Sequence, residues 1–163
     1  MTLAEVRALR AAGKHDEHLA AARALVAAEP SNVEAQLEAA YAHDRADRER
    51  EAITYYDAAY RLGVPASERR GFYVGFGSTL RNLGRADESV AVLAQAIADE
   101  PDYAPFHAFL ALSLFSSGHP REALAAMLGV ALEAAKPGAF DRYERALGEY
   151  HRELLGDTGA PLM

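Results

Sequence analysis

The chain has 163 residues, half of them hydrophobic and a quarter charged, which is the composition of an ordinary folded domain rather than of a disordered segment. Its formal net charge of -7 argues against nucleic acid and anionic membrane surfaces as partners, because both attract a surplus of Lys and Arg. Since the sequence contains no cysteine, disulfides and cysteine-based zinc sites are excluded.

Neither a signal peptide nor a membrane span is expected from the sequence. The beginning of the chain scatters Glu5, Arg7 and Lys14 among its apolar residues, so it lacks the uninterrupted apolar run of a signal peptide. The most apolar stretch, Tyr103 to Phe115, is shorter than the roughly 18 residues that a membrane-spanning helix needs. We therefore expect a cytoplasmic protein that does not bind membranes.

One pattern occurs four times along the chain. Each unit has two stretches with apolar residues at helical spacing, a short polar turn between them and a proline at the end, with a period of roughly 34 to 36 residues. The turns fall at Gly13, Asp47, Gly84 and Gly118, and the prolines are Pro30, Pro65, Pro101 and Pro137. The predicted repeats span residues 3–30, 31–65, 66–101 and 102–137.

The first two repeats are each predicted to be a helical hairpin. In the first, helices flank Gly13. In the second, Ser31 and Glu34 have the spacing of a capping box at the start of a helix. The second turn lacks glycine, and Asp47 is predicted to cap the helix that follows it.

The third and fourth repeats show clearer turn and cap residues. Gly84 stands where the first helix of the third repeat must end with a positive φ. In the fourth repeat Asp102 is a predicted N-cap, and Pro105 falls in the first helical turn, where its missing N–H is tolerated.

A further helix is predicted over residues 138–155. Its apolar stripe consists of Phe140, Tyr143, Leu147, Tyr150 and Leu154. This stripe is predicted to cover the open end of the last repeat, as the terminus of a stacked array requires. The same spacing also allows the stripe to pair two chains. Residues 157–163 are expected to form a flexible tail.

Small residues recur where the two helices of each unit cross. In the first helices these positions hold Val6, Ala40, Gly77 and Ala111; in the second helices they hold His18, Ala52, Ser89 and Ala123, and later Leu25, Ala59, Ala96 and Val130. In this respect the chain resembles the tetratricopeptide repeat (TPR) family, as an array of about four repeats of the small bacterial type. The resemblance implies an all-α, right-handed α-solenoid that forms a single domain over residues 1–156. The first repeat departs from the family pattern at His18 and Leu25.

The resemblance also implies a binding surface. In the family, the first helix of each repeat lines a concave groove that holds an extended peptide or a helix. The positions carried over to this chain are Arg7, Arg10, Tyr41, Asp44, Arg45, Val74, Ser78, Arg81, Asn82, Leu112 and Phe115. One subfamily grips a terminal carboxylate with Lys and Asn, but here Leu37, Tyr41, Val74 and Ser78 occupy those positions, so that mode is not expected.

The function predicted from these features is a non-catalytic protein-binding module, an adaptor or scaffold without cofactor, bound metal or catalytic residues. Its partner is an unidentified protein or peptide, and the chain is expected to be a monomer or homodimer. The first alternative is a structural module that self-associates through its ends or its last helix. The second is a helical metal-dependent hydrolase built around His15 and His18, two imidazoles three residues apart with carboxylates beside them.

Two groups of candidate groove residues each have a competing structural interpretation. Arg7, Arg10, Arg45 and Arg81 form either a positive ladder for an acidic peptide or ion pairs with neighbours such as Asp44. Leu112 and Phe115 form either a pocket for an apolar side chain or core packing against the last helix.

An aromatic group near the second repeat boundary is interpreted as core rather than as a cofactor site. Its members are Tyr55, Tyr56, Tyr60, Phe72, Tyr73 and Phe76. The nearby Gly71, Gly75 and Gly77 neither follow a strand nor open a phosphate-binding loop, so nucleotide binding is not expected.

Overall fold

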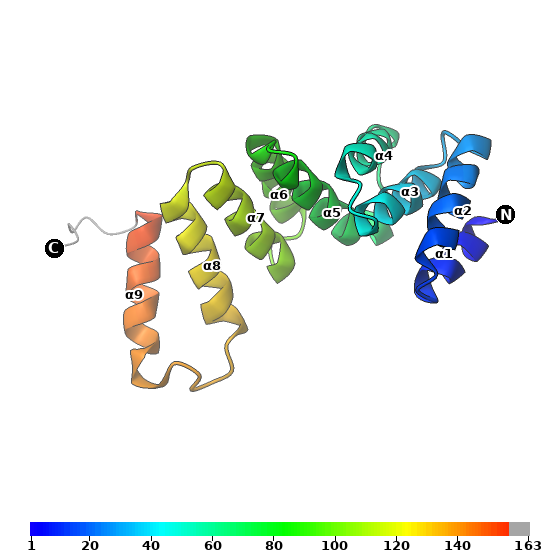
Figure 1. Cartoon of the computed structure of the whole chain (residues 1–163). Coiled ribbons are helices and arrows are strands. Elements are labelled where there is room, and N and C mark those ends of the chain that lie inside the picture. Colours follow the sequence, from blue (N-terminus) through cyan, green and yellow to red (C-terminus); the bar gives the residue numbers. More distant parts are fainter. Residues whose placement is uncertain (157–163) are drawn as a thin grey trace.

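The computed structural model describes residues 1–156 of the chain. Within this range the secondary structure is entirely helical, and successive hairpins stand side by side in chain order, with α1 and α9 at opposite ends of an elongated array (Figure 1). The elements are α1 (Leu3–Ala11), α2 (His15–Ala28), α3 (Val33–Arg45), α4 (Glu49–Leu62), the short 3-10 segment η1 (Ala66–Glu68), α5 (Arg69–Asn82), α6 (Ala86–Asp99), α7 (Ala104–Ser116), α8 (Pro120–Ala134), the 3-10 segment η2 (Asp141–Tyr143) and α9 (Glu144–Leu155). The predicted all-α solenoid is confirmed. The predicted tail, residues 157–163, lies outside the described part.

The four hairpin turns share one backbone conformation. Gly13, Gly84 and Gly118 have φ values of 70°, 78° and 83°, in the left-handed region that ends a helix with little strain only at glycine. Asp47 adopts φ 55° at the equivalent point of the second repeat, which Asp tolerates better than most residues. Asp47 therefore replaces the turn glycine, and the residue that precedes α4 as N-cap is Arg48.

Two helix starts differ from the sequence prediction by one residue. The N-cap of α3 is Asn32 rather than Ser31, and its side-chain oxygen accepts hydrogen bonds from the backbone N–H groups of Glu34 and Ala35. The N-cap of α7 is Tyr103 rather than Asp102, and Pro105 lies within the first turn as predicted. At α3 the neighbouring Asn32 competes with Ser31 as the cap, whereas no side chain caps the start of α7.

Small residues allow the helices of a hairpin to cross closely. A Cβ atom added to Gly77 in α5 would lie 2.9 Å from Cγ of Leu93 in α6, so this position has no room for a side chain. The hydroxyl of Ser89 donates a hydrogen bond of 2.6 Å to the carbonyl oxygen of Gly77 across the same crossing. The close packing predicted for Gly77 is therefore present.

The core is continuous from the second to the fourth repeat. It contains residues of α3 to α7, namely Leu37, Ala40, Ala52, Ile53, Tyr56, Ala59, Phe72, Tyr73, Phe76, Leu80, Leu93, Ala96 and Phe106. A second cluster joins the first repeat to α3 through Val6, Ala21, Ala22, Leu25, Ala35, Ala39 and Ala42. Most rings of the predicted aromatic group are packed into these clusters or against them, which supports the core interpretation, whereas Tyr60 is more exposed and stacks on Phe72 with the ring planes 8° apart.

The last helix covers only part of the open end. Turns and η2 occupy the beginning of the predicted 138–155 segment, and α9 starts at Glu144. Of the predicted stripe, Leu147 and Leu154 are half-buried, but Tyr143 and Tyr150 are 56% and 55% exposed. Within residues 1–156, α9 packs on α8, and no Cα atom of α9 lies within 8 Å of a Cα atom of α7.

Candidate functional site: the groove along the first helices

The first helices of the hairpins form one continuous wall, because α1 contacts α3, α3 contacts α5, and α5 contacts α7. A pocket of about 510 Å³ opens in this wall between α1, α3 and α5. It is lined by Arg10, Tyr41, Asp44, Arg45, Tyr56, Glu68, Gly71, Val74 and Gly75. Of the groove residues predicted from the sequence, Arg10, Tyr41, Asp44, Arg45 and Val74 line it.

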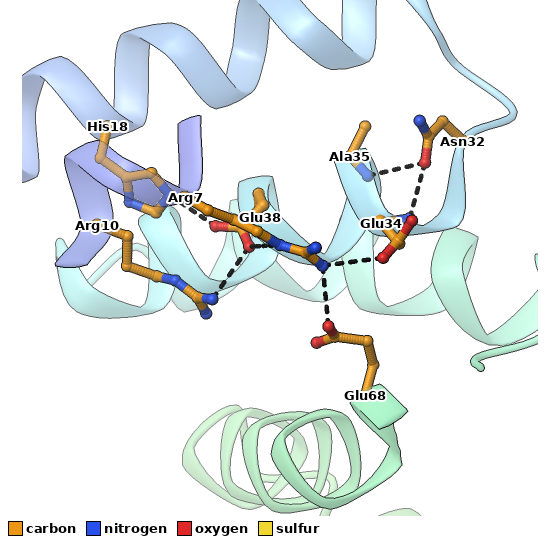
Figure 2. A network of polar contacts seen from close by, with 8 residues as sticks. All are labelled: Arg7, Arg10, His18, Asn32, Glu34, Ala35, Glu38 and Glu68. Carbon is orange, nitrogen blue, oxygen red and sulfur yellow. Dashed lines mark hydrogen bonds and ion pairs between the residues drawn. The ribbon is translucent and has the colours of Figure 1, made fainter. Parts of the chain in front are cut away.

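Arg7 belongs to a polar network beside this pocket (Figure 2). At its centre is Glu38, whose side chain is 1% exposed. One Glu38 carboxylate oxygen lies 3.2 Å from both the Arg7 Nε and an Arg10 terminal nitrogen, and the other lies 3.0 Å from His18 Nε2. A buried carboxylate is tolerated only when such partners compensate for its lost hydration.

The same network extends across three repeats. A terminal nitrogen of Arg7 lies 3.0 Å from Glu34 and 2.8 Å from Glu68, so one guanidinium joins α1, α3 and η1. Partial burial lowers the pKa of Arg7, but the hydrogen bonds to Glu34 and Glu38 outweigh it and raise the pKa above its ordinary value. Arg7 and Arg10 are thus paired internally, with these glutamates rather than with Asp44.

Asp44 lines the pocket and also holds three helices together. It accepts hydrogen bonds of 2.6 Å from the hydroxyl of Tyr56 in α4 and 2.7 Å from the hydroxyl of Thr79 in α5. Burial raises the pKa of the Asp44 carboxyl, and the two hydrogen bonds offset part of this rise. Burial and the neighbouring Asp44 also raise the pKa of Tyr56, so its hydroxyl remains a donor.

Several donors at this face have no partner within the described residues. The Tyr41 hydroxyl is buried and makes no hydrogen bond, and the Nε of Arg81 is also buried without a partner. Burial raises the pKa of Tyr41, so its hydroxyl stays protonated at neutral pH. Arg45 is exposed, and no carboxylate of residues 1–156 lies within ion-pair distance of Arg45 or Arg81.

Two glycines of α5 make room for the tyrosines of the pocket. A Cβ atom at Gly71 would lie 3.2 Å from the Tyr41 hydroxyl oxygen, and one at Gly75 would overlap the Tyr56 hydroxyl. The groove prediction omitted these glycines, although their separation by four residues places them on one face of a helix. It also omitted Glu68, because nothing in a single sequence shows which charged residues face the pocket.

The remaining predicted residues lie further along the wall. Ser78 is half-buried and Asn82 exposed on α5, while Leu112 and Phe115 are exposed on α7. Phe115 is 70% exposed and borders a shallow apolar groove between α7 and α8. Core packing of Leu112 and Phe115 against the last helix is therefore wrong.

The two histidines of the metal hypothesis differ in their exposure to solvent. His15 is exposed at the start of α2, whereas His18 is buried and engaged with Glu38. In the described part of the chain, no group of three or more His, Asp or Glu side chains is arranged to hold a metal ion.

No helix among residues 1–156 combines the length and the apolar character needed to cross a membrane.

Comparison with known proteins supports the family suggested by this architecture. Three solved structures have similar folds. An O-GlcNAc transferase mutant from Thermobaculum terrenum has a TM-score of 0.69 at 22% identity, over 83% of this chain and 26% of that one. MamA protein has a TM-score of 0.69 at 14% identity, over 99% and 76% of the two chains. YrrB, described as a TPR protein with an unusual peptide-binding site, has a TM-score of 0.68 at 16% identity, over 93% and 84%.

These identities show a common fold, and the chain spans about a quarter of the transferase structure. No curated protein matches the sequence. The tetratrico peptide repeat family model matches residues 33–154, which is most of the chain. The chain therefore belongs to the tetratricopeptide repeat family.

Proposed function

We propose that the chain is a non-catalytic module that binds a protein or peptide segment along the wall formed by α1, α3, α5 and α7. The observation that carries this proposal is the pocket between three consecutive first helices. It is lined by the exposed Arg45, which has no ion-pair partner among residues 1–156, and by Tyr41, whose buried hydroxyl has no hydrogen-bond partner there. The membership of a protein-interaction family agrees with this function. The buried ionisable groups beside the pocket are satisfied by one another, as in a structural network.

The unpaired donors indicate the chemistry of the segment. Arg45 carries an uncompensated positive charge at the pocket, and the Tyr41 hydroxyl has a hydrogen to donate. The acidic groups of the pocket are already engaged, Asp44 by two hydroxyls and Glu68 by Arg7. An acidic side chain of the bound segment fits these donors, since charge-assisted hydrogen bonds are the strongest that the site can form.

A second contact is available further along the same wall. Phe115 occupies in α7 the position that Asp44 occupies in α3, four residues after the small residue of the helix crossing. Leu112 and Phe115 are exposed there, and a large exposed aromatic ring is a typical anchor in protein recognition. We therefore expect the segment to combine an acidic residue with an apolar one that reaches α7.

Selection from a phage-displayed library of random peptides tests this function. The expected result is an enriched family of peptides with Asp or Glu at a fixed distance from a large apolar residue. Arg45→Ala should weaken binding of a selected peptide roughly tenfold or more, as loss of a charged hydrogen bond does, and Phe115→Ala should have an effect of similar size. Arg61→Ala is the matched control, because Arg61 is an exposed arginine on α4. Failure to enrich any peptide, or equal effects of Arg45→Ala and Arg61→Ala, would contradict the proposal.

A further inference from the structure

The open end of the fourth repeat has an uncovered apolar surface, which we call the seat. The seat is an apolar groove of about 290 Å³ between α7 and α8, lined by Ala111, Leu112, Phe115, Pro120, Ala123, Leu124 and Met127. In the earlier repeats the first helix of the next repeat covers the equivalent surface. In the second repeat, Gly75 of α5 packs against Tyr56, and in the third, the hydroxyl of Ser113 in α7 lies 2.7 Å from the hydroxyl of Ser89.

Exposure at equivalent positions shows that this cover is missing in the fourth repeat. Tyr56, Leu93 and Met127 each follow the early small residue of their helix by four positions, and they are 1%, 0% and 38% exposed. The residue immediately after the early small one is Ile53 in the second repeat, which is 8% exposed, and Leu124 in the fourth, which is 58% exposed. The groove therefore has the apolar chemistry of a repeat–repeat contact without the helix that completes it.

The chain's own α9 lies on a different face of α8. His151 packs against Gly129, where a Cβ atom would lie 3.0 Å from the imidazole Nε2. A terminal nitrogen of Arg121 donates a 2.7 Å hydrogen bond to the carbonyl oxygen of Glu153. These contacts hold α9 beside α8, and among the described residues no Cα atom of α9 lies within 8 Å of one in α7. It thus leaves the seat uncovered.

The sequence of α9 and the segment before it nevertheless follows the pattern of a first helix. Phe140, Tyr143, Leu147 and Gly148 have the same spacing as Tyr103, Phe106, Leu110 and Ala111 at the start of the fourth repeat. Phe106 is 1% exposed at its repeat boundary, whereas Tyr143 is 56% exposed. Tyr143 is the N-cap of α9 and Tyr150 follows it by seven residues, which places both rings toward one side of this helix. Both rings are more than half exposed, although Arg142 donates a hydrogen bond to the Tyr143 hydroxyl and lies 5.1 Å from the centroid of that ring.

We propose that the seat between α7 and α8 is a self-association surface, occupied by α9 of a second copy of this chain. A two-fold arrangement fills both seats at once, because each copy contributes one seat and one helix. Each α9 keeps its contacts with its own α8 through His151 and Glu153. In this arrangement it places Tyr143 and Tyr150 against Leu124 and Met127 of the other copy. This inference goes beyond peptide binding and does not depend on it.

Light scattering after size-exclusion chromatography tests the association across micromolar to millimolar concentrations. The wild-type protein should pass from monomer to dimer within this range. Leu124→Glu in the seat and Tyr150→Glu on α9 should each raise the dimer dissociation constant at least about tenfold, because both place a charge in an apolar contact. Leu62→Glu is the matched control, since Leu62 is 44% exposed at the end of α4, and it should leave the dissociation constant unchanged. A wild-type protein that stays monomeric at every concentration, or a dimer that Leu124→Glu leaves intact, would overturn the proposal.

Cysteine cross-linking identifies the occupant, because the natural sequence contains no cysteine. When a Met127→Cys chain and a Tyr150→Cys chain are mixed and oxidised, they should form a disulfide-linked heterodimer. Its yield should exceed the yield of the disulfide-linked homodimer that either variant forms by itself. Circular dichroism on each variant verifies that the helices are retained. In a chain with both substitutions, an intramolecular disulfide without any linked dimer would show that the chain's own α9 enters the seat, and would overturn occupation by a second copy.

Discussion

His18 and Glu38 face each other across the first repeat boundary, with the His18 Nε2 atom 3.0 Å from a carboxylate oxygen and both side chains 1% exposed. The second oxygen of Glu38 is shared by Arg7 and Arg10. The position of His18 normally holds a small residue in this family. A buried carboxylate that engages three basic side chains therefore replaces part of the apolar packing between the first two repeats.

Removing the Glu38 carboxylate should destabilise the protein strongly. Glu38→Ala leaves Arg7, Arg10 and His18 without their common partner, and breaking a buried ion pair in this way typically costs about 3 to 5 kcal/mol. Glu34→Ala is the control, because Glu34 is a more exposed acceptor of the same guanidinium and its loss should cost about 1 kcal/mol or less. Urea unfolding followed by circular dichroism measures both, and equal losses would show that Glu38 is not the centre of the network.

Removing each of the two tyrosine hydroxyls of the pocket should have a different effect on the stability of the protein. The Tyr56 hydroxyl donates to Asp44 at 2.6 Å, so Tyr56→Phe should lower the free energy of unfolding by about 1 to 3 kcal/mol. The Tyr41 hydroxyl is buried without a partner, so Tyr41→Phe should leave stability unchanged or raise it by up to about 1 kcal/mol. If this hydroxyl donates to the bound segment, Tyr41→Phe also weakens the affinity for a selected peptide. A Tyr41→Phe protein that is less stable than Tyr56→Phe would contradict this assignment.

The Asp44 carboxyl should make stability depend on pH. Because burial raises its pKa in the folded state, the folded protein binds the proton more tightly than the unfolded chain does. The stabilising contribution of protonated Asp44 is fully present below the pKa that this carboxyl has in the unfolded chain. It is lost as the pH rises through the higher pKa of the folded protein. Asp44→Asn does not titrate, so its stability relative to wild type should increase as the pH rises from acidic to neutral.

Urea unfolding of wild type and Asp44→Asn at several pH values measures this difference. The control site is Asp87, which is exposed in the first turn of α6. Asp87→Asn should show no comparable increase. A stability difference for Asp44→Asn that falls or stays flat with pH would contradict a raised pKa.

Two helical glycines should differ in the effect of an added methyl group. Gly75→Ala places a Cβ atom against Tyr56, which Asp44 holds in position, so overpacking should cost about 1 to 3 kcal/mol. Gly148→Ala in α9 meets no atom within 4 Å, and the better helix propensity of Ala should stabilise α9 by up to about 1 kcal/mol. Thermal unfolding compares the two variants, and a stabilising Gly75→Ala would show that Tyr56 can move away.

The sequence predicts the array well because its signals are local. The turn positions depend on φ, so Gly13, Gly84 and Gly118 are recognisable from the glycine alone, and Asp47 is the tolerable substitute. The small residues at the crossings, such as Gly77, are likewise set by contacts within one hairpin. Apolar periodicity then identifies the helices themselves.

The polar part of the site is harder to predict because it depends on which repeats contact each other. Arg7 and Arg45 both qualify as groove cations by their spacing, but only Arg7 meets Glu34, Glu38 and Glu68, which come from α3 and η1. Likewise, the apolar stripe of α9 is evident from the sequence, while the face of α8 on which it packs is decided by Gly129 and Arg121. Single-sequence reasoning contains no information on these pairings.

The most direct test of the central claim, that the wall of first helices binds a peptide segment, is to map a selected peptide onto the protein by amide chemical-shift changes in NMR spectra. We expect the largest changes at Tyr41, Arg45, Gly71 and Gly75 around the pocket, continuing to Leu112 and Phe115 on α7. Changes confined to the second helices α2, α4 and α6 would contradict the account.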